Sequence, residues 1–434
     1  MKNYHYKEAC TYIENIPKFT KKHSLTHTER FLKQLGNPCE KKKIIHVAGT
    51  NGKGSVCAYM EALLESEGKS VGMFTSPHLV KLNERIKVQN QDVSDEEFCR
   101  VFDRTKTIAV EMEQEGLGHP SYFEFLFGMA MLVFEQTEVE YLILETGLGG
   151  RLDATNVVKN PLVCIITSIG HDHMEVLGET IEEIASEKAG IIKQGVPLIC
   201  DGNNSEALSV LQRKCAQLNC SCVGITKKEY EINRISYKNV DFSISSAYYE
   251  DIVWKLKCGS KYQPMNAILA LEAMRVIAGK EEFAKSLNVW SEALLNVRWP
   301  GRMEEVMPRI ILDGGHNMEA IQEVIHTIGN QNCSILYAAV SDKDYEGILS
   351  YLARHLHARR FILTTLTDSR GVEGQKLAEV VRQESDAEVI VAQNVKDAFE
   401  VAVDKKEKDE NLYCLGSLYL VGEIKEMIEE EYPC

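Results

Sequence analysis

A glycine-rich segment with a single lysine, His46–Ser55, follows an apolar, β-branched stretch and precedes a helix-like one. Glycines let backbone N–H groups approach a polyphosphate closely, while the helix N-terminus and Lys53 add positive charge for its oxygens. The standard phosphate-loop pattern has a glycine six residues before the lysine and a serine or threonine directly after it. Here those positions hold Val47 and Gly54, and the hydroxyl comes at Ser55. An exposed glycine turn is the alternative, but the strand–loop–helix context favours phosphate binding.

A second glycine-rich segment, Glu145–Asn156, also follows an apolar strand-like run. A carboxylate at the tip of a strand beside a phosphate loop is well placed for Mg²⁺, which prefers oxygen ligands. A glutamate at a strand end is more often simply solvated, so the prediction that Glu145 binds Mg²⁺ rests on the phosphate loop beside it. The next apolar strand ends before His171-Asp172-His173. Zinc is disfavoured there because no cysteine or third histidine accompanies the pair.

Two further segments combine charged residues with a helix or a turn. Lys188 lies on a helical stretch that starts near Thr180, and a surface ion pair is its simplest interpretation. If Lys188 faced a metal instead, carbamylation, the addition of CO₂ to the neutral amine, would turn it into an anionic ligand. Asp313–Asn317 lies between an apolar strand and a helix, where Asp and Asn are ordinary caps. The alternative is that Asp313 and His316 face a cleft and contact a nucleotide.

The elements that must position these residues alternate between strands and amphipathic helices. Ser94–Glu97 is a capping box that opens a helix, and Pro17 closes the first helix. The pattern predicts helices over 6–16, 56–68, 94–109 and 122–134, and strands over 70–74, 139–144, 162–167, 310–312, 334–339, 360–364 and 388–392. Such alternation indicates parallel sheets with a site along the edge where the strands end. Between residues 202 and 260 the pattern weakens into polar, strand-like pieces.

The chain, at 434 residues, is too long for one typical core, so about two or three domains are expected. Trp299-Pro300-Gly301 breaks helical structure, and the composition changes on either side of it. We therefore predict an α/β protein with an N-terminal P-loop-type ATPase domain over 1–296 and a linker over 297–301. A smaller C-terminal Rossmann-like α/β domain is expected over 302–434, and the N-terminal sheet should be mostly parallel.

Bulk composition excludes several classes of protein. A hydrophobic content of 44% and a charged content of 26% are ordinary for a globular chain, and the net charge of −15 argues against a nonspecific nucleic-acid surface. The 13 cysteines are scattered without a Cys-x-x-Cys pair, which fits free thiols in a reducing cytoplasm. Residues 1–20 lack the apolar core of a secretion signal, and no stretch approaches the ~18 apolar residues of a membrane span. We expect a cytoplasmic protein with small-molecule substrates and with neither nucleic acid nor membrane as a partner.

A dozen short segments occur together and in order along nearly the whole chain. They are Gly49–Ser55, Thr75–His78, Asn83–Ile86, Tyr122–Phe125, Glu145–Asn156, Asp172-His173, Glu187–Ile191, Gln263–Ala267, Trp299–Arg302, Asp313–Asn317, Ser341–Asp344 and Gly416–Tyr419. This set resembles the folylpolyglutamate synthases of the Mur ligase superfamily, including the bacterial bifunctional form with dihydrofolate synthase activity. The motif Arg151-Leu152-Asp153-Ala154 is similar to the sequence found at this place in the bifunctional members.

The resemblance implies roles for residues of this sequence. The ATP phosphates would lie against Thr50, Asn51, Gly52, Lys53, Gly54 and Ser55, and the nucleotide would also contact Asn266, Arg302 and Asp313, the last two across an interdomain cleft. One Mg²⁺ would be held by Ser76 and Glu145, and a second by Glu145, His173 and carbamylated Lys188. The pterin substrate would bind at Ser121, Tyr122, Phe123, Glu124, Leu152, Asp153 and Ala154. Lys53, His173, Lys188 and His316 would serve the chemistry, His316 close to the nucleotide.

The implied activity is ATP-dependent, ADP-forming addition of L-glutamate to dihydropteroate and to the γ-carboxylate of (tetrahydro)folate through an acyl phosphate, by a monomer. A folylpolyglutamate synthase without the second activity, a muramyl-peptide ligase that uses a UDP-sugar, and a non-catalytic nucleotide-binding regulator are the alternatives. Ser121–Glu124 and the short N-terminal segment disfavour the muramyl-peptide ligase, and the retained Glu145, His173 and Lys188 disfavour the regulator. The family's second-domain loop reads Asp-Gly-Ala-His-Asn-Pro, whereas Gly315 and Met318 replace its alanine and proline here. Losing the proline removes a residue whose φ is pre-organised for a helix start.

Overall fold

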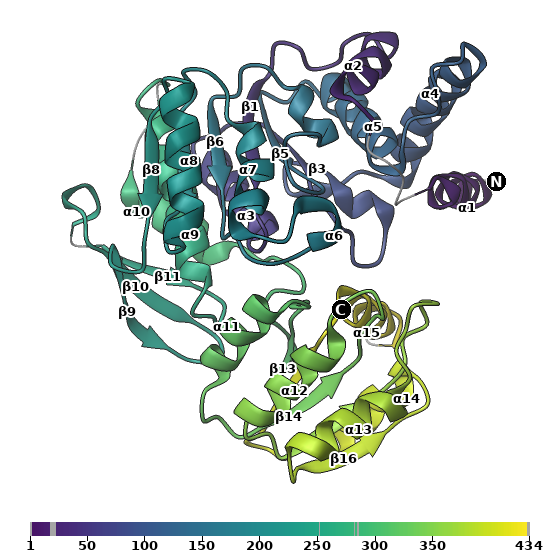
Figure 1. The fold of residues 1–434 in the computed structure, drawn as a ribbon, viewed down its shortest axis with the longest axis vertical. Helices are drawn as coiled ribbons and strands as arrows, with labels where there is room; N and C mark the ends of the chain where they lie inside the picture. The colour runs from purple at the N-terminus through teal and green to yellow at the C-terminus, as the bar shows by residue number, and fades with distance from the viewer. Residues whose placement is uncertain (1, 18–22, 251, 282, 284–285, 432–434) are drawn as a thin grey trace. The chain divides into compact units, whose positions relative to one another are not determined.

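The computed structural model describes residues 2–17, 23–250, 252–281, 283 and 286–431. They form two compact units, which Figure 1 draws as one ribbon. The first unit contains Met1–Glu229 and Met265–Leu294, and the second contains Tyr230–Pro264 and Leu295–Cys434. Each unit is built around a mostly parallel sheet, as the alternation of strands and helices predicts. Within the described residues, no helix combines the length and apolar character needed to cross a bilayer.

An eight-stranded sheet forms the centre of the first unit, in the order β4-β3-β2-β5-β1-β6-β7-β8. The six strands from β2 to β8 in this order are parallel, whereas β3 is antiparallel to β2 and β4 is antiparallel to β3. The strands are β1 (Lys43–Ala48), β2 (Val71–Phe74), β3 (Ile86–Val88), β4 (Gln91–Asp92), β5 (Tyr141–Glu145), β6 (Val163–Ile166), β7 (Leu198–Asp201) and β8 (Cys222–Ile225). Because β2, β5 and β6 are buried along their whole length, the sheet is covered on both faces.

Helices provide this cover. They are α1 (Lys2–Asn15), α2 (Leu25–Gln34), α3 (Lys53–Ser66), α4 (Asp95–Gln114), α5 (Tyr122–Gln136), α6 (Met174–Leu177), α7 (Ile181–Lys188), α8 (Ser205–Gln217), α9 (Gln263–Ala278) and α10 (Leu287–Asn296). Short 3₁₀ helices lie at Leu82–Arg85, Ala154–Val157 and Ala189–Ile191, and another, Ala247–Tyr249, belongs to the second unit. The apolar residues of α5 form one cluster with Phe74 and Leu144, and those of α7 and α8 form another with Ile166 and Leu198. Ser94 caps α4 by accepting a hydrogen bond from the Glu97 N–H, at the predicted helix start.

The second unit contains a six-stranded sheet in the order β12-β13-β17-β14-β15-β16. All neighbours are parallel except β12, which is antiparallel to β13. The strands are β12 (Glu304–Met307), β13 (Ile310–Leu312), β14 (Cys333–Tyr337), β15 (Arg360–Leu363), β16 (Glu388–Val391) and β17 (Asn411–Leu415), and the helices are α11 (Met318–Ile328), α12 (Tyr345–His355), α13 (Gly374–Glu384), α14 (Val395–Lys405) and α15 (Leu418–Glu431). A separate antiparallel sheet has the order β11-β10-β9, with β9 (Tyr230–Ile235), β10 (Val240–Ile244) and β11 (Val253–Leu256).

The two compact units and the predicted domains differ over residues 230–264. These residues were expected in the N-terminal domain, over 1–296, but their contacts group them with the second unit. The Lys261 N–H donates to Thr327 Oγ1 at 3.1 Å, and the Tyr262 hydroxyl donates to Asp313 Oδ2 at 2.7 Å. Hydrogen bonds between residues this far apart in the chain have no local sequence signal. The domain limits 1–296, 297–301 and 302–434 stay a prediction.

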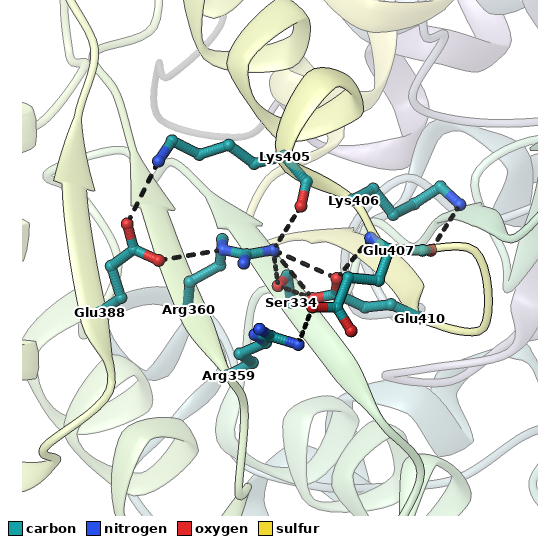
Figure 2. A network of polar contacts seen from close by, with 8 residues as sticks. All are labelled: Ser334, Arg359, Arg360, Glu388, Lys405, Lys406, Glu407 and Glu410. Atoms are coloured by element: carbon teal, nitrogen blue, oxygen red, sulfur yellow. Dashed lines mark hydrogen bonds and ion pairs between the residues drawn. The ribbon is translucent and has the colours of Figure 1, made fainter.

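The amino ends of the strands in the second unit are joined by an ionic network with the buried pair Arg360–Glu410 at its centre (Figure 2). The Arg360 guanidinium donates to Glu410 Oε2 at 3.1 Å, to Glu388 Oε2 at 3.2 Å and to the Lys405 carbonyl at 2.9 Å. Burial alone would raise the pKa of Glu410, but hydrogen bonds from Ser334 and the Glu407 N–H, together with Arg360, lower it overall. This network connects β14, β15 and β16 at the edge opposite to the one where Asp313 follows β13, so its role is structural.

Candidate active site

The predicted phosphate loop connects the end of β1 to the start of α3. Gly49 has a φ of 149° and Gly52, the N-cap of α3, has a φ of 89°. A Cβ at Gly49 would lie 1.8 Å from Thr167 Oγ1, and one at Gly52 would lie 2.3 Å from Asn266 Oδ1. Both positions therefore require glycine, for backbone conformation and for space.

The loop is held in place by the segment that follows the neighbouring strand β6. The Thr50 N–H donates to the Ser168 carbonyl at 2.7 Å, and the Gly170 N–H donates to Thr50 Oγ1 at 3.1 Å. Ser168 Oγ in turn donates to the Asn51 carbonyl at 3.2 Å. These bonds fix the loop before any ligand binds, so its backbone conformation is pre-organised.

Three charged side chains converge on this loop. Lys53 Nζ lies 3.9 Å from Glu145 Oε1 and donates to the carbonyls of Gly49 and Thr50. Lys188 Nζ donates to the Gly49 carbonyl at 2.7 Å, and Lys188 is only 3% exposed. The interpretation of Lys188 as a surface ion pair is therefore wrong. Glu145 is 2% exposed at the end of β5, and its Oε2 accepts a hydrogen bond from the Ser76 N–H at 3.2 Å.

His173, unlike Glu145 and Lys188, is largely exposed to solvent. It is the N-cap of the short helix α6 with a φ of 51°, and its side chain is 42% exposed. Its Nε2 lies 3.8 Å from Asp172 Oδ1. The structure thus places His173 after β6, on the edge that also carries the loop, but with its side chain largely in solvent.

The predicted pterin segment opens α5 and contains a strongly bonded carboxylate. Ser121 and Glu124 form a capping box, in which Glu124 Oε2 accepts from the Ser121 N–H and hydroxyl. Glu124 also accepts from Thr28 Oγ1 at 2.6 Å and faces the Nδ1 atoms of His27 and His23 at 3.0 and 2.7 Å. Burial raises the pKa of Glu124, but these hydrogen bonds more than offset it and lower the pKa to about 2.

The neighbouring aromatic residues of this segment are packed against other loops. The Arg85 guanidinium lies 5.4 Å from the centroid of the Tyr122 ring, at the distance of a cation–π contact. The Phe123 ring lies 5.3 Å from that of Phe74, and it fills the space where a Cβ at Gly147 would lie 2.7 Å away.

Asp153 holds the second glycine-rich segment in its turn. Its Oδ2 accepts from the N–H groups of Gly147 and Leu148 at 2.9 and 3.0 Å, and its Oδ1 accepts from the N–H and hydroxyl of Thr155. Asp153 is 3% exposed, and Leu152 and Ala154 flank it in the chain. The carboxylate is thus engaged within its own loop.

In the second unit, Asp313 organises the turn after β13. Its carboxylate accepts from the Tyr262 hydroxyl, from the Met303 N–H at 2.9 Å and from the Gly315 N–H at 2.8 Å. Burial first, and Asp313 second, raise the pKa of Tyr262 well above its ordinary value. His316 Nδ1 lies 2.8 Å from the Gly314 carbonyl, and Arg302 donates to the Gly301 carbonyl at 3.0 Å.

Asn317 is the N-cap of α11, because its Oδ1 accepts a hydrogen bond from the Ala320 N–H at 2.9 Å. The ordinary capping interpretation is therefore right for Asn317. A Cβ at Gly315, where the family has alanine, would lie 3.0 Å from Asp313 Oδ1.

Comparison with known proteins decides among the families with such a loop. The Mur ligase middle domain matches residues 47–274, and the glutamate ligase domain of Mur ligases matches residues 301–418. A dihydrofolate synthase/folylpolyglutamate synthase of Bacillus subtilis is 34% identical over 98% of this chain and 99% of its own length. The chain belongs to the folylpolyglutamate synthase family of Mur ligases.

Solved structures of this family have the same fold. The folylpolyglutamate synthase of Thermotoga maritima is 29% identical, with a TM-score of 0.84 over 98% of this chain and 97% of that chain. Escherichia coli FolC in complex with DHPP and ADP is 27% identical, with a TM-score of 0.83 over 98% of each chain. The family, the α/β fold class and the ligase class predicted from the sequence are therefore confirmed.

Sequence reasoning missed the residues that support the loop and the pterin segment. Ser168 follows β6, next to β1 in the sheet, so its position after a strand end was an available signal. His23, His27 and Thr28 contact Glu124 from nearly a hundred residues away in the chain. The i, i+4 spacing of the two histidines was visible, but nothing local connects it to Glu124.

Proposed function

We propose that the chain adds L-glutamate to dihydropteroate and to the γ-carboxylate of folates, with ATP as the second substrate and ADP as a product. The Bacillus subtilis relative carries both synthase names, and the Escherichia coli relative was solved with DHPP and ADP. The observation in this chain that carries the proposal is the convergence of the Gly49–Gly52 loop, Lys53, Lys188 and Glu145 at the carboxyl edge of a parallel sheet. Phosphate ligands bind at such an edge, where backbone N–H groups and a helix N-terminus face the ligand.

The reaction needs ATP because a carboxylate and an amine do not condense in water. A carboxylate oxygen of the acceptor attacks the γ-phosphorus of ATP, ADP leaves, and an acyl phosphate forms. The α-amine of glutamate then attacks the acyl carbon through a tetrahedral intermediate, and phosphate leaves with the original carboxylate oxygen. Lys53, next to the loop, is placed to stabilise the charge of the transferring phosphoryl group, where positioning and electrostatics supply most of the catalysis.

The donors around Glu145 fit magnesium. A buried carboxylate and the serine hydroxyl at position 76 are hard oxygen ligands, and Mg²⁺ prefers these to nitrogen or sulfur. We propose that Ser76 and Glu145 hold one ion, and that Glu145, His173 and a carbamate on Lys188 hold a second. Carbamylation would exchange the buried ammonium of Lys188, which now donates to the Gly49 carbonyl, for an anionic oxygen ligand. Bound Mg²⁺ would neutralise charge on the phosphates.

The nucleotide site we propose is built on the glycine loop after β1. Thr50, Asn51, Gly52, Lys53, Gly54 and Ser55 would bind the phosphates. Asn266, whose Oδ1 would lie 2.3 Å from a Cβ at Gly52, belongs to the same surface as the loop. Arg302, Asp313 and His316 are proposed nucleotide contacts on the strength of the family likeness, and Asp313 is fixed by three hydrogen bonds to its neighbours.

The pterin is proposed to bind at two segments, Ser121–Glu124 and Leu152–Ala154. The partly buried Phe123 ring would offer a stacking surface for a flat heterocycle, whereas Tyr122 is buried next to Arg85. The carboxylates of Glu124 and Asp153 are engaged in hydrogen bonds within the protein, so we assign them a positioning role in which they fix these two loops.

The assay that tests this function compares acceptors. Purified protein with Mg-ATP and glutamate should release ADP when either dihydropteroate or tetrahydrofolate is added, and not without an acceptor. Release with tetrahydrofolate alone would establish a monofunctional folylpolyglutamate synthase, and release only with a UDP-muramyl peptide would overturn the proposal. We also propose a monomeric cytoplasmic enzyme, which light scattering of the purified protein and fractionation of the host cell would test.

A further inference from the structure

Two histidines of the first unit face one carboxylate, at the point where the N-terminus of α5 meets α2. His23 Nδ1 lies 2.7 Å from Glu124 Oε2, His27 Nδ1 lies 3.0 Å from Glu124 Oε1, and the two ring centroids are 4.0 Å apart. Within the described residues, this is the one group of three or more His, Cys, Asp or Glu whose ligand atoms lie within 4.8 Å of one another. Glu124 and His27 are mostly buried, with side chains 5% and 12% exposed, whereas His23 is 33% exposed.

Each ring nitrogen of His27 faces an acceptor. Its Nε2 lies 3.3 Å from the Gly118 carbonyl, and its Nδ1 faces the Glu124 carboxylate. Both partners are acceptors, because a carbonyl never donates and Glu124 remains ionised at neutral pH. A neutral imidazole has a single N–H, so it can satisfy only one of them. A neutral ring with its proton on Nδ1 donates to Glu124 and leaves the Gly118 carbonyl without a donor from Nε2, whereas a metal ion on Nδ1 would let Nε2–H donate to that carbonyl.

The spacing of the three ligand groups suits a metal ion. A zinc ion with bonds of about 2.0–2.1 Å needs ligand atoms roughly 3.3 Å apart. His23 Nδ1 lies 2.7 Å from Oε2 of Glu124, His27 Nδ1 lies 3.0 Å from Oε1, and one ligand atom from each of the three residues lies within 4.8 Å of the other two.

The surroundings are those of a ligating set. The Ser121 N–H and hydroxyl and the Thr28 hydroxyl hold the Glu124 carboxylate, and the Gly118 carbonyl orients the His27 ring. Such outer hydrogen bonds to ligating histidines and carboxylates are typical of protein metal sites. The partial exposure of His23 leaves a path for the ion and room for a fourth, solvent ligand.

We propose that His23, His27 and Glu124 form a site for a divalent transition-metal ion, with Zn²⁺ as the ion that this nitrogen and oxygen set fits best. The ion would tie the segment from His23 to Thr28 to the start of α5. The site uses none of the loop residues at Gly49–Ser55; it shares Glu124 with the proposed pterin segment, but metal binding is measured without substrate or turnover.

The test uses Co²⁺ as a spectroscopic probe and Zn²⁺ as its competitor. After chelator treatment and dialysis, the full chain should bind one equivalent of Co²⁺ at this site, with the visible bands of a four- or five-coordinate ion, and Zn²⁺ should displace it. Co²⁺ on cysteine is distinguished by its thiolate charge-transfer bands in the near ultraviolet. His27→Ala and His23→Ala should each weaken binding at least about tenfold. Lowering the pH should also weaken it, because protons compete for the imidazoles.

His5→Ala is the matched control. His5 also pairs with a carboxylate, that of Asp103 at 3.1 Å, so its loss should leave Co²⁺ binding unchanged. If His27→Ala impairs folding, as judged by circular dichroism, the more exposed His23 carries the test. Binding without these bands, or binding that His23→Ala and His27→Ala leave unchanged, would overturn the proposal and leave hydrogen bonds between the two histidines and Glu124 as the whole interaction. Neither result depends on ligase activity, so failure here is distinct from failure of the proposed function.

Discussion

Replacing Gly52 with alanine should disable the glycine loop while the first unit stays folded. Gly52 is the N-cap of α3 with a φ of 89°, a left-handed conformation that costs an L-residue roughly 1–2 kcal/mol. The added methyl group would also lie 2.3 Å from Asn266 Oδ1. Either the amide of Asn266 must rotate or the loop must move, and both changes alter the proposed nucleotide site.

Gly68→Ala is the matched control, because Gly68 has a φ of 72° and nothing lies within 4 Å of its would-be Cβ. Urea denaturation should show both variants losing roughly 1–2 kcal/mol of unfolding free energy. Only Gly52→Ala should also lower kcat/KM for ATP, by at least about tenfold, which corresponds to about 1.4 kcal/mol of transition-state stabilisation. ADP release measures this loss.

Asn266→Ala removes the side chain that the new methyl group at position 52 would overlap, so it separates this steric effect from the backbone effect. In that background Gly52→Ala should cause a smaller further loss, because the side chain it displaces is gone, and a double-mutant cycle gives the coupling energy. If Gly52→Ala and Gly68→Ala leave kcat/KM for ATP equally intact, the reasoning that links the loop to Asn266 is refuted.

Three further predictions follow from buried charges. Lys188→Ala should abolish turnover and recover part of it with added acetate, and wild-type turnover without acetate would disprove the carbamate. Arg360→Ala should lower the free energy of unfolding by about 3–5 kcal/mol, because it leaves Glu410 buried and unpaired, whereas the exposed Arg354 should tolerate alanine in the same denaturation assay. Burial raises the pKa of Glu61 to about 7, so the folded chain retains a proton that the unfolded chain loses, and stability should fall as pH rises from about 4.5 to 7. Between pH 5 and pH 8, the unfolding free energy of Glu61→Gln should fall by roughly 2–3 kcal/mol less than that of the unsubstituted protein. If both proteins show the same pH dependence of unfolding, the raised pKa assigned to Glu61 is wrong.

The alternation of strands and helices was predictable because it is a local property of the chain. β1, β5 and β6 are short apolar runs that end in polar residues, so the carboxyl edge of the sheet and the loop at Gly49–Ser55 could be placed from sequence. The helix α8, over Ser205–Gln217, was missed, because its apolar residues lie within a polar stretch. The grouping of residues 230–264 with the second unit depends on long-range hydrogen bonds such as that from Tyr262 to Asp313, which no local pattern specifies.

The chemistry of the site was less accessible than its place in the fold. The sequence pattern around Lys188 is typical of a surface residue, and only the folded chain shows that its ammonium is buried against the Gly49 carbonyl. The resemblance assigns Glu124 to the pterin segment, but only the folded chain shows its capping box with Ser121 and the histidines that face it from the N-terminal segment. In both cases the partners are far apart in sequence, and their pairing is set by packing that no local pattern specifies.

The central claim is that a carboxylate oxygen of the acceptor leaves as phosphate. Dihydropteroate labelled with ¹⁸O in its carboxylate, incubated with Mg-ATP, glutamate and the enzyme, tests it directly by mass spectrometry of the released phosphate. The account predicts one ¹⁸O atom transferred to inorganic phosphate for each amide formed. Amide formation with unlabelled phosphate would contradict it.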